Sequence, residues 1–231
     1  MPALLLDPAL SLAADVLDDL EKVRTANANR LRILTTPHDQ PDEDGECRGF
    51  GLDESHPDVA RLAAMVDTLA RTEHDAVLQL QRQMRRHPLA PWAKARRGVG
   101  EKQAARLLAA VGDPYWNTLH DRPRTVSELW AYCGLHVTPQ GTSARRQRGV
   151  PSNWSTGAKT RAYLVAVSCM KSVGSDYRQV YLDRRAHTAG THPDWTDGHS
   201  HNDALRVLSK ALLRDLWRES ARVHGEVVAA A

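Results

Sequence analysis

The residues with the clearest chemical potential lie between Ala95 and Pro114, where two glycines flank one apolar residue ahead of a helix-forming run. Gly98 and Gly100 permit a tight turn and a close approach of the backbone to a phosphate. Amides at the start of the following helix form the positive end of its dipole and can bind an anion. Val99 is expected to anchor the turn in the core. The spacing predicts a helix-hairpin-helix on the DNA backbone; a glycine turn between two core helices is the alternative.

Basic side chains adjoin this turn and recur further along the chain. Arg96, Arg97 and Lys102 add charge that selects no particular base. No Asp or Glu occurs between Glu128 and Asp176, and this acid-free stretch is predicted to contact phosphates. Its run at 145–148 is predicted to clamp a phosphate, a solvated charge run being the alternative. The predicted DNA-binding residues are Arg96, Arg97, Gly98, Val99, Gly100, Lys102, Arg145, Arg146, Arg148, Lys159 and Arg161.

Two aromatic residues lie near these cations in the sequence, and a row of basic residues follows on the last predicted helix. Trp154 and Tyr163 are predicted to be core residues, with stacking on unpaired bases as the alternative. On the last predicted helix, basic residues recur every fourth position, and like charges at this spacing repel. Three acidic residues, each three positions before an arginine, are predicted to neutralise these basic residues locally. Contact of the basic residues with nucleic acid is the alternative. The basic residues are Arg206, Lys210, Arg214, Arg218 and Arg222, and the acidic residues are Asp203, Asp215 and Glu219.

Patterns for metal or thiol chemistry are weak. Histidines and aspartates are frequent over residues 187–203, but their spacing fits no zinc motif, so no metal site or cofactor is expected. The three cysteines are widely separated and form no CxxC pair, which favours a reducing cytoplasm over a disulfide framework. No secretory signal or membrane-spanning run is recognised. We therefore expect a cytoplasmic protein without membrane partners.

Charge is distributed unevenly along the chain, although the net charge is only +3. Residues 1–84 hold sixteen acids and eight bases, whereas residues 85–231 hold twelve acids and twenty-three bases. Such asymmetry predicts either an anionic partner for the basic half or shielding of one half by the other.

The elements that must position these residues are predicted to be helical. Apolar residues recur at three- and four-residue spacing, and alanine, leucine and arginine favour helices, so an all-α fold without strands is expected. Capping boxes are predicted at Ser55 and Ser200, and Thr125 is predicted to cap a further helix. The buried stripe of the last helix is predicted to be Leu205, Leu208, Leu212 and Leu216. Two parts are expected: a helix with an acidic linker at 1–54, and a helical domain at 55–231 with the hairpin at 94–114.

Several segments in order resemble a known family. HPLAPWAKARRGVGEKQAARLLAAVGDP, then VSELWAYCGLHVT, then a basic loop and GAKTRAYLVAVSCMK are similar to the C-terminal domain of DEDD-type, RNA-guided insertion-sequence transposases and pilin-gene invertases. The resemblance covers about residues 58–187. It implies a domain that binds DNA and a guide RNA and contributes a nucleophilic serine beside a Ser-Gly step. It also implies a separate RNase-H-like half whose four acids bind magnesium.

The chain departs from that pattern at two places. Its first 90 residues are predicted to be helical rather than RNase-H-like, and the Ser-Gly step aligns with Gln140 and Gly141, leaving Ser143 as the nearest hydroxyl. Ser143 is therefore the candidate catalytic residue. The leading prediction is a DNA-binding protein related to these transposases. The alternatives are an active recombinase with magnesium-binding acids from a partner chain, and a non-enzymatic structural protein; homo-oligomerisation is left open.

Overall fold

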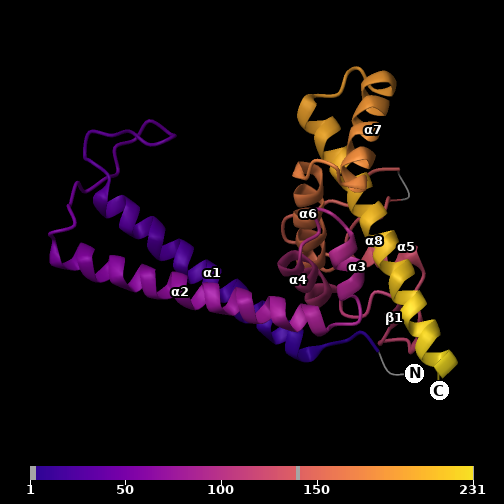
Figure 1. The fold of residues 1–231 in the computed structure, drawn as a ribbon. Helices are drawn as coiled ribbons and strands as arrows, with labels where there is room; N and C mark the ends of the chain where they lie inside the picture. Colours follow the sequence, from indigo (N-terminus) through magenta and orange to yellow (C-terminus); the bar gives the residue numbers. More distant parts are fainter. Residues whose placement is uncertain (1–3, 139–140, 231) are drawn as a thin grey trace. The chain divides into compact units, whose positions relative to one another are not determined.

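The computed structural model describes residues 4–138 and 141–230, and this part of the chain is mainly helical, which confirms the predicted all-α class. The described residues form eight helices and one short hairpin, and their course is drawn in Figure 1. The helices are α1 (Pro8–Thr35), α2 (Pro57–Arg86), α3 (Ala90–Ala95), α4 (Glu101–Val111), α5 (Val126–Tyr132), α6 (Thr156–Lys171), α7 (Asp176–Thr191) and α8 (Asp197–Ala230).

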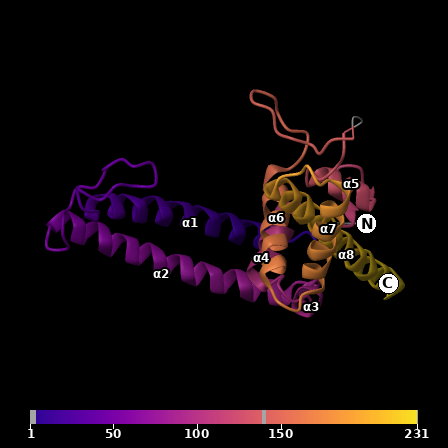
Figure 2. The same ribbon diagram turned by 90° about the horizontal axis from the view of Figure 1, so that it is seen from above.

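One compact unit, residues 12–80, is a helical hairpin formed by most of α1 and α2. The two helices run side by side in Figures 1 and 2, and Arg24 of α1 pairs with Glu73 of α2. The segment between them is tied back onto α1, because Phe50 N donates to Ile33 O at 3.0 Å. The boundary predicted after residue 54 does not coincide with this unit, since α1 pairs with the helix that follows the linker.

The second unit, here called the main unit, comprises residues 4–11 and 81–230. Within it α5, α6 and α7 pack against α8, and α4 packs against α6. The four leucines predicted for the buried stripe of the last helix are at most 1% exposed, so that prediction is confirmed. Their burial makes α8 the scaffold of the main unit, because it removes apolar surface from water along most of the helix.

Only some of the helices begin at the capping residues that the sequence predicts. Thr125 caps α5 as predicted, and with Glu128 it also forms a capping box. The boxes predicted at Ser55 and Ser200 are wrong. The Ser55 hydroxyl lies 2.5 Å from Asp53 Oδ1, before α2 begins. Ser200 lies inside α8, because Thr196 caps that helix by accepting from His199 N at 3.3 Å, and the Ser200 hydroxyl contacts α7 instead.

A short antiparallel pair, β1 (Trp116–Asn117) and β2 (Arg122–Pro123), contradicts the expectation of no strand. Trp116 pairs with Pro123 and Asn117 with Arg122. Two-residue strands carry no alternation in the sequence, which explains why the pattern did not predict them.

A buried polar cluster holds the ends of the main unit together. The Asp113 carboxylate follows α4, lies 2.7 Å from His224 Nε2 on α8 and accepts from Leu5 N at 3.1 Å. His87 Nε2 donates to Leu5 O at 3.2 Å, and its Nδ1 accepts from Leu89 N at 3.1 Å. These partners require a neutral ring, and burial lowers the pKa of His87 accordingly.

The predicted glycine turn lies between α3 and α4, with both glycines at positive φ. Gly98, at φ +94°, packs against α6, where an added Cβ would lie 2.7 Å from Cys169 Cα. Gly100, at φ +68°, has open space at the same position. Glycine is therefore favoured at the two positions for different reasons. Gly98 permits close packing against α6, whereas Gly100 permits only the turn.

This difference predicts unequal effects of Gly98→Ala and Gly100→Ala on stability. Gly100→Ala should lower the free energy of unfolding by about 1 kcal/mol, the conformational penalty alone. Gly98→Ala should lower it by about 3 kcal/mol, because overpacking against α6 is added. Urea denaturation followed by circular dichroism measures both. Equal losses in the two variants would contradict the packing role of Gly98.

Candidate nucleic-acid interface

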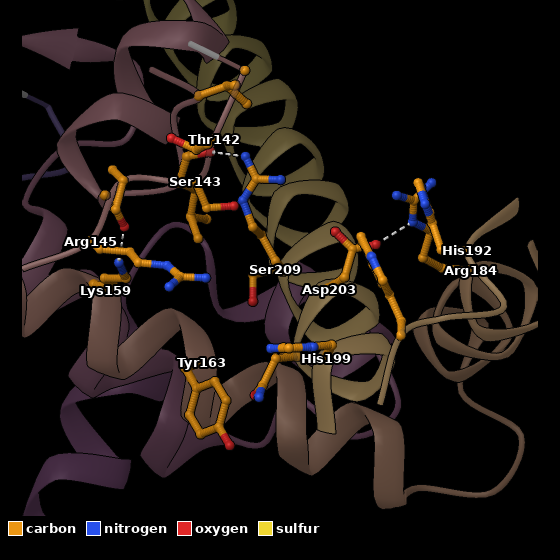
Figure 3. A pocket seen from close by; sticks show the side chains of 18 residues that line it. Thr142, Ser143, Arg145, Lys159, Tyr163, Arg184, His192, His199, Asp203 and Ser209 are labelled. Atoms are coloured by element: carbon orange, nitrogen blue, oxygen red, sulfur yellow. Dashed lines mark hydrogen bonds and ion pairs between the residues drawn. The ribbon is translucent and has the colours of Figure 1, made fainter. Parts of the chain in front are cut away.

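A cavity of about 810 Å³ lies within the main unit, lined by residues from the segments 134–137 and 141–145, from α6, α7 and α8, and from the loop between α7 and α8. Figure 3 shows Arg145 and Lys159 on one side of it and Arg184, His192 and Asp203 on the other. Four of the lining residues are permanent cations: Arg145, Lys159, Arg184 and Arg206. Asp203 is the one carboxylate among the described lining residues.

Backbone pairing between two short segments places the predicted residues Ser143 and Arg145 in the lining of this cavity. Thr138 N donates to Thr142 O at 2.8 Å, and Val137 pairs with Ser143 in an antiparallel bridge. The segment then continues as an irregular loop toward α6 (Figure 2). Gln140, which aligns with the serine of the family's Ser-Gly step, lies outside the described residues, whereas the Ser143 backbone is fixed by this bridge.

Two cations of the cavity are held by neutral partners. Lys159 Nζ donates to Ala144 O at 3.2 Å and lies 5.2 Å from the centroid of the Trp154 ring. Arg206 Nη2 donates to Leu135 O at 3.0 Å. Burial, and then the positive charge of Arg206, lower the pKa of Lys159. Because both effects oppose the ammonium ion, the site would be stabilised by an anion.

Lys210 extends this arrangement by one turn of α8. Its Nζ lies 4.1 Å from the centroid of the Trp130 ring, a cation–π contact. Burial and the charge of Arg206 lower the pKa of Lys210 as well. We call Lys159, Arg206 and Lys210 the cationic cluster. Arg206 Nε, at its centre, is buried without a hydrogen-bond partner in the described part of the chain.

Several other arginines of the main unit pair with carboxylates. Arg184 Nε lies 2.5 Å from Asp203 Oδ2, so the prediction that Asp203 neutralises Arg206 is wrong: the nearer partner comes from α7. The two other predicted pairs on α8 are confirmed, with Asp215 3.8 Å from Arg218 and Glu219 2.5 Å from Arg222. Across the described residues, none of these ion pairs includes Lys159, Arg206 or Lys210, so the charge of the cationic cluster is not compensated by a carboxylate there.

The glycine turn is a weaker anion site than the sequence predicts. Val99 is fully buried and its amide donates to Arg96 O at 3.1 Å, so this amide is not available to a phosphate. The inward packing of Gly98 likewise corrects its predicted role as a point of phosphate approach. Arg96 lies close enough to Glu219 on α8 to lower the pKa of that carboxyl, secondarily to Arg222. Arg97 is exposed.

A carboxylate already occupies the start of α4. Glu101 Oε2 lies 2.8 Å from Arg85 Nη2, and the hydrogen bond from Arg85 lowers the pKa of Glu101. A phosphate at Gly100 would meet this negative charge. Lys102 and Arg161 are half-buried, and each already interacts within the protein.

The predicted phosphate-contacting residues therefore separate into two places. Gly98 packs at Cys169, whereas Lys159 lies ten residues earlier on α6, about 15 Å away at the helical rise. Arg146 and Arg148 are exposed in the loop and do not line the cavity.

The chain matches no protein-family model, no curated protein and no solved structure. Across residues 4–138 and 141–230, no three His, Cys, Asp or Glu side chains lie where they could hold a metal ion. Within the same residues, no helix is both long and apolar enough to cross a bilayer.

Several lining residues were not predicted as site residues. His192, Trp195 and His199 belong to the polar segment in which the sequence shows no zinc spacing, and Arg206 was assigned a local partner. Only the packing of α7 and α8 brings these residues to Lys159. The core prediction for Tyr163 is wrong, because its side chain is 44% exposed and lines the cavity.

An anion in the cavity should raise the lowered pKa of Lys159, because it offsets the repulsion from Arg206. Anion binding should therefore weaken as pH rises through the pKa of Lys159 in the free protein, and Lys159→Arg should remove most of that dependence. NMR titration of the lysine Cε–Hε signals with and without inorganic phosphate measures this. The Lys171 signal, at the other end of α6, should not respond. An unchanged Lys159 titration with phosphate bound elsewhere would contradict the site.

Proposed function

We propose that this protein binds DNA through its phosphate backbone, with the cavity beside the cationic cluster as the principal contact. The observation that carries the proposal is the uncompensated charge of Lys159 and Arg206, which are held by carbonyls and an aromatic ring instead of carboxylates. Phosphate oxygens supply the negative charge and the acceptors that these groups lack. Arg145 adds a third cation at the mouth of the same cavity.

The proposed contact is with backbone rather than with base edges. Arg146 and Arg148 continue the basic run next to Arg145 and are exposed, so they can follow a phosphate chain beyond the cavity. The exposed turn at Arg97 and Gly100 is a secondary contact in this proposal. Relationship to insertion-sequence transposases, and a guide RNA as further partner, are proposed from the order of the motifs in the sequence.

Arg145→Ala should weaken duplex DNA binding about tenfold, because it removes a cation that lines the cavity. Arg148→Ala removes the same charge from the same loop but outside the cavity, and it should weaken binding only about twofold. Fluorescence anisotropy with a labelled duplex over a range of salt concentrations measures both. The salt slope should fall by about 1 for Arg145→Ala.

Equal losses in the two variants would show that the loop acts only as diffuse charge. Wild-type affinity that does not change with salt would contradict phosphate binding altogether, provided that circular dichroism shows the protein folded.

A second candidate function is DNA recombination with Ser143 as nucleophile. The observation that favours it is the position of Ser143 in the lining of the cavity, next to the cations that would hold a phosphate. Attack would form an Oγ–phosphorus bond and break the bond from phosphorus to a deoxyribose oxygen, and the serine proton would pass to that leaving oxygen, which departs as a hydroxyl. Magnesium and its acidic ligands would have to come from a partner chain.

This candidate predicts a covalent protein–DNA adduct that is lost in Ser143→Ala and retained in Thr142→Ala, the adjacent hydroxyl on the same turn. Denaturing gel electrophoresis after incubation with radiolabelled duplex and magnesium detects the adduct. An adduct that persists in Ser143→Ala would exclude this serine, and the DNA-binding proposal would be unaffected.

A further inference from the structure

We infer that the cavity accepts one unpaired nucleotide of a DNA strand, with its phosphate at the cationic side and its base stacked on His192 and Trp195. This inference rests on the proposed DNA binding, and it specifies the form of DNA that the same site takes. His192 and Trp195 line the cavity but have no role in the proposed contact with the phosphate backbone.

The two rings form a stack that is already assembled in the loop between α7 and α8. The His192 and Trp195 ring centroids lie 4.2 Å apart with an interplanar angle of 7°. Trp195 N donates to His192 O at 3.0 Å, so a turn of the backbone fixes both rings. Trp195 is half-buried, whereas His192 is exposed, and both line the cavity. The two rings therefore stand in the lining of the cavity as a preassembled stack.

The two halves of a nucleotide match opposite sides of this cavity. Figure 3 shows Arg145 and Lys159 on one side and His192 on the other. The cationic side suits a phosphate, and a flat ring suits the face of a base. The volume of about 810 Å³ lies within the range of pockets that enclose small molecules.

An unpaired base fits this arrangement better than a base in a duplex. Both faces of a base in a duplex are covered by its neighbours, and only an extruded or single-stranded base can lie on a protein ring. A phosphate contact alone would need no aromatic stack in the lining. The combination of charge and preassembled rings thus favours single-stranded or locally opened DNA.

The experiment compares a 12-nucleotide oligothymidylate with the same oligonucleotide carrying abasic sites, which keeps the phosphates and removes bases. Wild type should bind the complete strand about tenfold more tightly than the abasic strand. Trp195→Ala and His192→Ala should remove most of that difference, whereas Phe50→Ala, an exposed aromatic substitution outside the cavity, should leave it unchanged. Anisotropy measures the affinities, and circular dichroism checks that each variant is folded.

Arg145→Ala should weaken both strands alike, since it removes a phosphate contact. Equal affinity of wild type for the complete and abasic strands, with salt-dependent binding intact, would overturn the stacking inference and leave the proposed function standing. A base-dependent difference that survives in both Trp195→Ala and His192→Ala would also overturn it. No binding of either strand or of duplex DNA would overturn both.

Discussion

Partly desolvated positive charge without a carboxylate partner is the constraint that organises the main unit. Lys159, Arg206 and Lys210 repel one another, and they are held in place by backbone carbonyls and by the rings of Trp154 and Trp130. Folding must offset that repulsion through packing elsewhere. Sites that store uncompensated charge in this way are commonly functional, because the missing counter-charge is supplied by a ligand.

The packing that offsets this repulsion comes chiefly from α8. Its leucines are buried along one stripe, and the same helix presents Arg206 and Lys210 to the cluster and Asp203 to Arg184. Near its other end, buried His224 contacts Asp113 after α4. Arg206 and Lys210 therefore project from a helix that is fixed along its length, whereas Ser143 and Arg145 come from a loop fixed mainly by a short bridge. Such a division suits a rigid phosphate site with an adjustable edge.

Local patterns predicted the fold better than they predicted the site. The Thr125 cap and the leucine stripe depend on residues within a few turns of one another, and both are confirmed. Ser143, Arg145 and Lys159 were predicted separately, and the structure brings them to one cavity. The inward packing of Gly98 and the pairing of Asp203 with α7 depend on which helix lies opposite, and sequence spacing does not encode that neighbour.

The most direct test of the central claim is to map the DNA contact residue by residue, using amide and side-chain NMR shifts during titration with a short duplex. The account predicts the largest changes at Ser143, Arg145, Lys159 and Arg206, with smaller changes at Arg97 and Gly100. Shifts confined to the α3–α4 turn, or spread evenly over the basic surface with the cavity unaffected, would contradict it.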